Sequence, residues 1–258
     1  MDTLARRAEE IRARVAEAAN RSGRPANAVT IVAVSKTISP DAIRQAFDAG
    51  FTTFGENRVQ EARDKIPALP LPGIRWELIG HLQTNKVARA VALFNRIQSV
   101  DSLRVAEALH EAAARQGRVV PILLEVNVAH EASKSGLAPD ELLPIAAALQ
   151  GLPALRPEGL MTVAPLVEDA EGVRPIFQQL RRLRDQLRRD DRTSSGDAGL
   201  WRELSMGMSD DFAVAIEEGA TIVRIGRALF GARAQPQRKS EEDADQNHGY
   251  PESGYAIQ

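Results

Sequence analysis

The sequence predicts a single (β/α)8 barrel preceded by one additional helix, and three observations support this fold class. Eight short apolar runs alternate with amphipathic segments of helical period, which is the pattern of parallel strands joined by crossover helices. The length of 258 residues suits eight such units in one domain. No G-x-G-x-x-G motif follows the first predicted strand, so an open doubly wound sheet is the less favoured alternative.

The additional helix is predicted over residues 3–20, where apolar residues recur every three or four positions. These residues are Leu4, Ala8, Ile11, Val15 and Ala18. The first strand is predicted at Val29–Val34, a continuous apolar run typical of a strand that is covered on both faces. Ser39 can cap the helix that follows, Pro40 suits its first position, and Gly50 can end it.

The alternation then continues to the end of the predicted barrel. The other strands are predicted at Thr52–Glu56, Trp76–Gly80, Asn95–Val100, Val119–Asn127, Glu158–Val163, Glu203–Met208 and Thr221–Gly226. The other helices are predicted near residues 58–66, 84–93, 102–116, 139–150, 173–189 and 210–218. Residues 190–199 are small and polar, which indicates a loop. Apolar periodicity ends near residue 233, so we expect a barrel over 1–233 and a disordered tail over 234–258.

The composition excludes several classes of function. The chain has no cysteine, which excludes disulfides, thiolate catalysis and cysteine-ligated metal, and its four histidines show no H-E-x-x-H motif. We therefore expect no metal site. No signal peptide or membrane-length apolar run is present, which predicts a cytoplasmic protein that does not bind membranes. The net charge of −2 gives no general attraction to nucleic acid, and the basic segment 173–189 has the apolar stripe of an outer barrel helix.

In a (β/α)8 barrel the active site lies at the carboxyl ends of the strands, so the residues there are the candidates for function. In chain order they are Lys36, Asn57, His81, Asn85, Lys86, Asn127, Met161, Ser205, Met208, Ser209, Arg224, Gly226 and Arg227. A lysine at a strand end is usually solvated or paired, and a reactive role needs the lowered pKa that burial and a nearby cation can produce. The hydroxyls and glycine of "SMGMS" and the turn "RIG" suit a phosphate group.

Several motifs occur in order along the chain, namely "AVSKT", "FGENRVQE", "WELIGHLQTNK", "SVDS", "GLMT", "ELSMGMSDDF" and "VRIGRALFG". They resemble motifs of the pyridoxal phosphate homeostasis proteins, which are similar to the barrel domain of alanine racemase standing alone. The resemblance extends from about Leu4 to Arg233. It implies that the protein binds pyridoxal 5'-phosphate (PLP) as its cofactor and acts in PLP homeostasis without established catalytic turnover. It further implies that the protein's partners, besides PLP, include PLP-dependent apo-enzymes. We expect a monomer, because no second domain is present to build a dimer of the racemase type.

The resemblance also assigns roles to matching residues. Lys36 would hold the cofactor as an internal aldimine, and Arg224 would face its pyridine nitrogen. Ser205, Ser209, Gly226 and the backbone at Arg227 would hold the phosphate, while Met208 would lie nearby. Asn57, Asn85 and Met161 would line the cofactor. Many members carry a small hydroxyl residue where this chain has Arg227, so a hydroxyl contact would be lost there and a cationic one gained.

Two other hypotheses use the same residues. One is a PLP-dependent amino-acid racemase or decarboxylase, for which His81 is the remaining acid–base candidate. We expect His81 to be structural instead. The other is a lysine-dependent aldolase acting on a phosphorylated sugar. It would need a carboxylate beside Lys36, and Glu56 is the candidate. A yellow cofactor band in the absorption spectrum would distinguish the cofactor hypotheses from the aldolase.

Overall fold

The computed structural model describes residues 3–129, 131, 135–190 and 199–231, and it confirms the closed (β/α)8 barrel. Its strands are β1 (Thr30–Val34), β2 (Thr53–Glu56), β3 (Arg75–Leu78), β4 (Arg96–Val100), β5 (Val120–Glu125), β6 (Leu155–Met161), β7 (Glu203–Ser205) and β8 (Ile222–Ile225). Each strand pairs in parallel with the next. The barrel closes where Thr30, Ile31, Val32 and Ala33 of β1 pair with residues 222–225 of β8.

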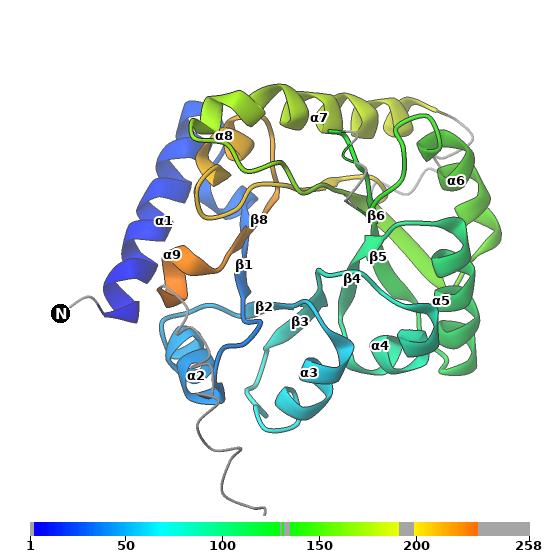
Figure 1. The fold of residues 1–258 in the computed structure, drawn as a ribbon, viewed down its shortest axis with the longest axis horizontal. Helices are drawn as coiled ribbons and strands as arrows, with labels where there is room; N and C mark the ends of the chain where they lie inside the picture. The colour runs from blue at the N-terminus through cyan, green and yellow to red at the C-terminus, as the bar shows by residue number, and fades with distance from the viewer. Residues whose placement is uncertain (1–2, 130, 132–134, 191–198, 232–258) are drawn as a thin grey trace, which may run out of the picture.

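A ring of helices surrounds the strands (Figure 1). The α-helices are α1 (Leu4–Arg21), α2 (Pro40–Asp48), α3 (Val59–Lys65), α4 (Val87–Leu93), α5 (Leu103–Arg115), α6 (Leu142–Ala148), α7 (Arg174–Arg189), α8 (Phe212–Glu217) and α9 (Arg227–Phe230). Short 3-10 helices lie at Ala26–Ala28, Thr84–Lys86, Leu149–Gly151 and Ala170–Val173. Among the described residues, no helix has both the length and the apolar character needed to cross a membrane.

The predicted elements are found with shifted ends, and the shifts have local causes. Strand β6 begins before the predicted start because Leu155 and the two residues after it already pair with β5, and the register shifts by one residue just after Pro157. Strand β7 ends early because Gly207, with a φ of 91°, turns the chain away from the sheet. Helix α9 was not predicted, because four residues are too few to show a helical period.

The additional helix α1 covers the helices at the other end of the chain, as Figure 1 shows for α8 and α9. All five of its predicted apolar positions are buried. At the rim of this contact, Arg7 Nε donates to the carbonyl of Leu229 over 2.7 Å, and Arg21 pairs with Glu217 over 2.8 Å. Helix α1 therefore packs against α8 and α9, the last two helices of the described residues.

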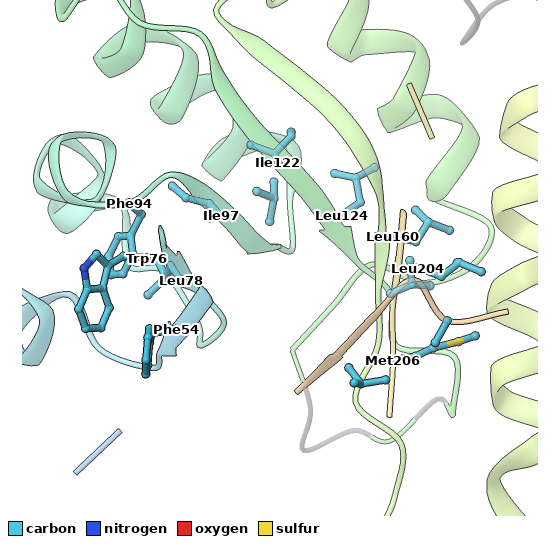
Figure 2. Packing of buried hydrophobic residues seen from close by; sticks show 14 of the residues in the cluster. Phe54, Trp76, Leu78, Phe94, Ile97, Ile122, Leu124, Leu160, Leu204 and Met206 are labelled. Atoms are coloured by element: carbon cyan, nitrogen blue, oxygen red, sulfur yellow. The ribbon is translucent and has the colours of Figure 1, made fainter. Parts of the chain in front are cut away.

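The core has two layers, one between the strands and the helices and one inside the barrel. In the outer layer, apolar side chains from neighbouring strands lie in line, as Ile122, Leu124, Leu160 and Leu204 do (Figure 2). The inner layer is a small cluster of Val32, Leu123, Met161 and Ile222. Above this cluster, the polar residues that end the strands face the mouth of the barrel.

The remaining sequence predictions concern the loops and the tail. The basic helix α7 buries Phe177, Leu180 and Leu187, which confirms its apolar stripe. The predicted tail at 234–258 lies outside the described residues, as does the predicted loop at 190–199 apart from its first and last residues.

Candidate functional site

Lys36 lies in a turn directly after β1, and the structure fixes the residue on each side of it. The carbonyl of Ser35 accepts a hydrogen bond from Lys65 Nζ over 2.8 Å. The N–H of Thr37 donates to Glu61 Oε1 over 2.5 Å, and Thr37 has a φ of 62°, which is uncommon for a residue other than glycine. Lys36 itself is half-buried. Its backbone is therefore held in a defined conformation at the mouth.

The groups that hold this turn form a buried ionic cluster behind it. Lys65 is only 8% exposed and pairs with Glu56 over 2.7 Å and with Glu61 over 2.8 Å. The hydroxyl of Ser35 donates to the same Glu56 oxygen over 2.6 Å. Burial raises the pKa of Glu56, and the hydrogen bond from Lys65 opposes that shift. Glu56 is fully buried in this cluster, so it is not the mouth-facing carboxylate that the aldolase hypothesis requires.

Arg224 is a buried cation inside the barrel, at 4% exposure. Its guanidinium donates to Ser205 Oγ over 2.6 Å and to the carbonyl of Thr162 over 2.8 Å. Burial lowers its pKa to about 10, which leaves it protonated at neutral pH. The Ser205 hydroxyl in turn donates to Gln98 Oε1 over 2.6 Å. The structure thus engages both Ser205 and Arg224 in one hydrogen-bonded chain, with Ser205 fully buried.

The loops after β7 and β8 meet at the mouth and present backbone donors there. The N–H of Ala228 donates to Ser209 Oγ over 3.2 Å, which ties the two loops together. Among the described residues, none accepts a hydrogen bond from the backbone N–H groups of Ser209, Asp210, Gly226 or Arg227. Several converging donors without acceptors are suited to an anion. The Arg227 guanidinium instead pairs with Asp210 at the surface.

The other predicted residues occupy different depths. Met161 is fully buried in the inner cluster, and Met208 is half-buried, with its N–H donating to Asp211 Oδ1 over 2.5 Å. Asn57 is half-buried and lines a cavity beside the mouth. Asn85 is exposed in the 3-10 helix Thr84–Lys86 and is not among the residues lining that cavity. Asn57 therefore lies beside a cavity and Asn85 is exposed, and the predicted contacts of both with the cofactor stay predictions.

His81 is more than half exposed, and its Nδ1 lies 2.7 Å from Asp101 Oδ2. It also lines two cavities beside the mouth and is open to solvent, so its structural role stays a prediction.

Sequence reasoning missed Glu125, at the end of β5. It lines a cavity of about 150 Å³ with His81, Asn127 and Val163. Burial raises its pKa to about 7 and the nearby carboxylate of Asp101 adds to the shift, whereas Arg224 and His81 oppose it. A signal was available, because Glu125 occupies the same strand face as the inward Leu123, at a spacing of two. Among the described residues, no group of three or more acidic or histidine side chains is arranged to hold a metal ion.

The chain matches a family model described as "Alanine racemase, N-terminal domain" over residues 7–234. A pyridoxal phosphate homeostasis protein of Aquifex aeolicus is 42% identical over 220 residues, which are 85% of this chain and 94% of that protein. The protein of the same name in Pseudomonas aeruginosa is 42% identical over 233 residues, covering 90% and 97%. The chain belongs to the family of pyridoxal phosphate homeostasis proteins.

Solved structures of related chains agree with this assignment. PipY of Synechococcus elongatus PCC7942, in a structure with PLP bound, is 37% identical, with a TM-score of 0.75 and coverage of 89% of this chain and 100% of that one. The alanine racemase of Clostridium difficile is only 15% identical, with a TM-score of 0.62 over 80% of this chain and 53% of that one. The second likeness is one of fold alone, and family membership rests on the closer relatives.

Proposed function

We propose that this protein binds pyridoxal 5'-phosphate in PLP homeostasis and holds it through the amine of Lys36 without catalytic turnover. The observation that carries the proposal is the fixed turn at Lys36, directly after β1. Strand β1 pairs with β8, and the loops after β7 and β8 present backbone N–H donors that have no acceptor among the described residues. When bound, this cofactor supplies an aldehyde that reacts with amines. PLP in the related PipY structure and the names of the relatives support the proposal.

The residues present fit the parts of this cofactor. The backbone donors at Ser209, Gly226 and Arg227 suit its phosphate. The buried guanidinium of Arg224 can only donate, so it would leave a facing ring nitrogen unprotonated. We place Ser205 differently from the sequence prediction, because its hydroxyl is engaged by Gln98 and Arg224. In this proposal Ser205 orients Arg224, and Ser209 serves the phosphate, with Met208, Met161 and Asn57 around the cofactor.

The position of the covalent link tests the proposal. After incubation with PLP, borohydride reduction and proteolysis, mass spectrometry should find the pyridoxyl group on Lys36 in the wild-type protein. Lys86→Arg should keep the label at Lys36, because Lys86 lies in the 3-10 helix after β3, and β2 separates β3 from β1. Lys36→Arg should remove the label from the proteolytic peptide that contains position 36. A wild-type label on Lys86 or on another lysine, or no label at all, would refute the assignment.

The absence of turnover is part of the proposal, and it is tested separately. Racemisation requires acid–base groups on both faces of the substrate carbon, and an unprotonated ring nitrogen weakens the withdrawal of electrons from that carbon. We therefore expect no enzyme-like exchange of the α-proton of alanine for deuterium in heavy water with PLP-saturated protein. Exchange with inversion at enzyme-like rates, lost on Lys36→Arg, would favour the racemase hypothesis instead.

We further propose that the protein is a cytoplasmic monomer that passes PLP to apo-enzymes. A mouth that is open beside Lys36 would let an acceptor protein approach the cofactor, and the half-buried Ser209 and Met208 are accessible from the same side. Mixing the PLP-loaded protein with an apo-enzyme and following the recovery of that enzyme's activity would measure this transfer.

A further inference from the structure

A second cavity lies beside the barrel mouth, between the loops that follow β2 and β3, and has a volume of about 440 Å³. The loop on one side of the cavity follows β2, and β2 pairs with β1, the strand that Lys36 follows. Its polar lining residues are Asn57, Arg58, Gln60, His81, Gln83 and Lys86. They come from the motifs "FGENRVQE" and "GHLQTNK", most of which the cofactor proposal leaves without a role.

Two of the lining residues, Arg58 and Lys86, are cations, and none of the lining residues is a carboxylate. Within the described part of the chain, neither the Arg58 guanidinium nor the Lys86 ammonium forms an ion pair or a side-chain hydrogen bond. Arg63, on the helix that Arg58 precedes, pairs with Asp64 over 2.7 Å. Arg58 lies close enough to Glu61 to lower the pKa of that carboxyl, although the hydrogen bonds from Lys65 and from the Thr37 N–H lower it more. Glu61 Oε1 accepts both of these hydrogen bonds.

We propose that this cavity binds a small organic acid through its carboxylate. A guanidinium offers a planar pair of donors that matches a carboxylate, and an ammonium beside it adds a second charge-assisted hydrogen bond. The amides of Gln60 and Gln83 can orient the rest of the molecule, since each offers both donors and an acceptor. No carboxylate is among the residues that line the cavity, and Glu61, which interacts electrostatically with Arg58, already accepts hydrogen bonds from Lys65 and from the Thr37 N–H.

The size of the cavity favours a small molecule over a segment of another protein. Its volume lies within the range of roughly 300–1,000 Å³ that is typical of small-molecule sites. Arg58 is exposed and Lys86 is half-buried, so both side chains are accessible to a ligand that arrives from solvent. The inference is independent of the link at Lys36, because Arg58 and Lys86 neither hold the Lys36 turn nor belong to the proposed cofactor site.

Calorimetric titration of the full-length protein with glutamate, succinate and inorganic phosphate tests the inference. We expect saturable binding of a carboxylate that weakens about tenfold in each of Arg58→Gln and Lys86→Gln, since losing one charge-assisted hydrogen bond commonly has that effect. Binding should also weaken as salt is added. Arg89→Gln is the matched control, because it removes an exposed arginine on α4 outside the cavity and should leave binding unchanged.

Three results would overturn the proposal. One is the absence of saturable binding of either carboxylate at millimolar concentration. Another is carboxylate binding that is equally strong in wild type, Arg58→Gln and Lys86→Gln. The third is binding of phosphate or of a hexaglutamate peptide without either small carboxylate, which would assign the cavity to a phosphate compound or to a protein partner. Circular dichroism and thermal melts of each variant would show that it remains folded.

Discussion

Lys65→Met is expected to destabilise the protein by about 3–5 kcal/mol, because it leaves the fully buried Glu56 without its cation. The same substitution removes two hydrogen bonds that Lys65 Nζ donates, one to the Ser35 carbonyl and one to Glu61 Oε1. Both consequences loosen the turn that carries Lys36. Urea denaturation of the apoprotein would measure the loss of stability, and PLP titration would measure the loss of affinity at a urea concentration of zero.

Two further variants separate the buried charge from general effects of the substitution. Arg63→Met removes an exposed cation from the same helix, and its effect should stay within about 0.5 kcal/mol. Adding Glu56→Gln to Lys65→Met should recover much of the lost stability, since the carboxylate left unpaired is then neutral. A loss below about 1 kcal/mol for Lys65→Met, or a double variant as unstable as the sum of the two single ones, would contradict this account.

Glu125→Gln is expected to change how stability depends on pH. The folded-state pKa of Glu125 is about 7 and its ordinary value is 4.5, so the folded protein binds the proton more tightly than the unfolded chain does. Stability from this group is complete below pH 4.5 and falls as pH rises to about 7. The total loss is at most about 3 kcal/mol, from 1.36 kcal/mol per pKa unit. Glutamine cannot ionise, so the variant avoids this loss.

Urea denaturation at pH 5 and pH 8 would check this expectation. The variant should match the wild type within about 1 kcal/mol at pH 5 and exceed it by up to about 3 kcal/mol at pH 8. Glu107→Gln replaces an exposed glutamate on α5 and serves as the control, with a change within about 0.5 kcal/mol at both pH values. An equal difference between Glu125→Gln and wild type at the two pH values would show that Glu125 does not titrate in this range.

The fold was predictable because its signals are local and repeated. The spacing of Leu4, Ala8 and Ile11 predicts the buried face of α1, and the run Val29–Val34 predicts a strand covered on both sides. The ends of β6 and β7 were less predictable, because they depend on the register at Pro157 and the turn at Gly207. Those features arise from contacts between strands, which periodicity along one strand does not report.

The candidate site was predictable in position and less so in partners. Strand ends identify Lys36 and Arg224, since parallel strands bring their carboxyl ends together. Nothing in the sequence near Ser205 indicates that Gln98, more than a hundred residues earlier in the chain, accepts its hydrogen bond. The same holds for Lys65, which looks like an ordinary residue at a helix end until the structure shows it beneath the Lys36 turn.

The pairing of β1 with β8, which closes the barrel, has a consequence for the nascent chain during synthesis. During synthesis α1 and β1 leave the ribosome before the other helices and strands of the barrel. One edge of β1 then has no partner until β8 follows, and the apolar face of α1 is not covered until α8 and α9 follow. The contact between β1 and β8, here called the seam, is therefore the last part of the barrel to form. Lys36 lies on one side of this seam and the loops after β7 and β8 lie on the other. A ligand that contacted both sides would stabilise the seam, so binding of the cofactor would favour the closed barrel over the open chain.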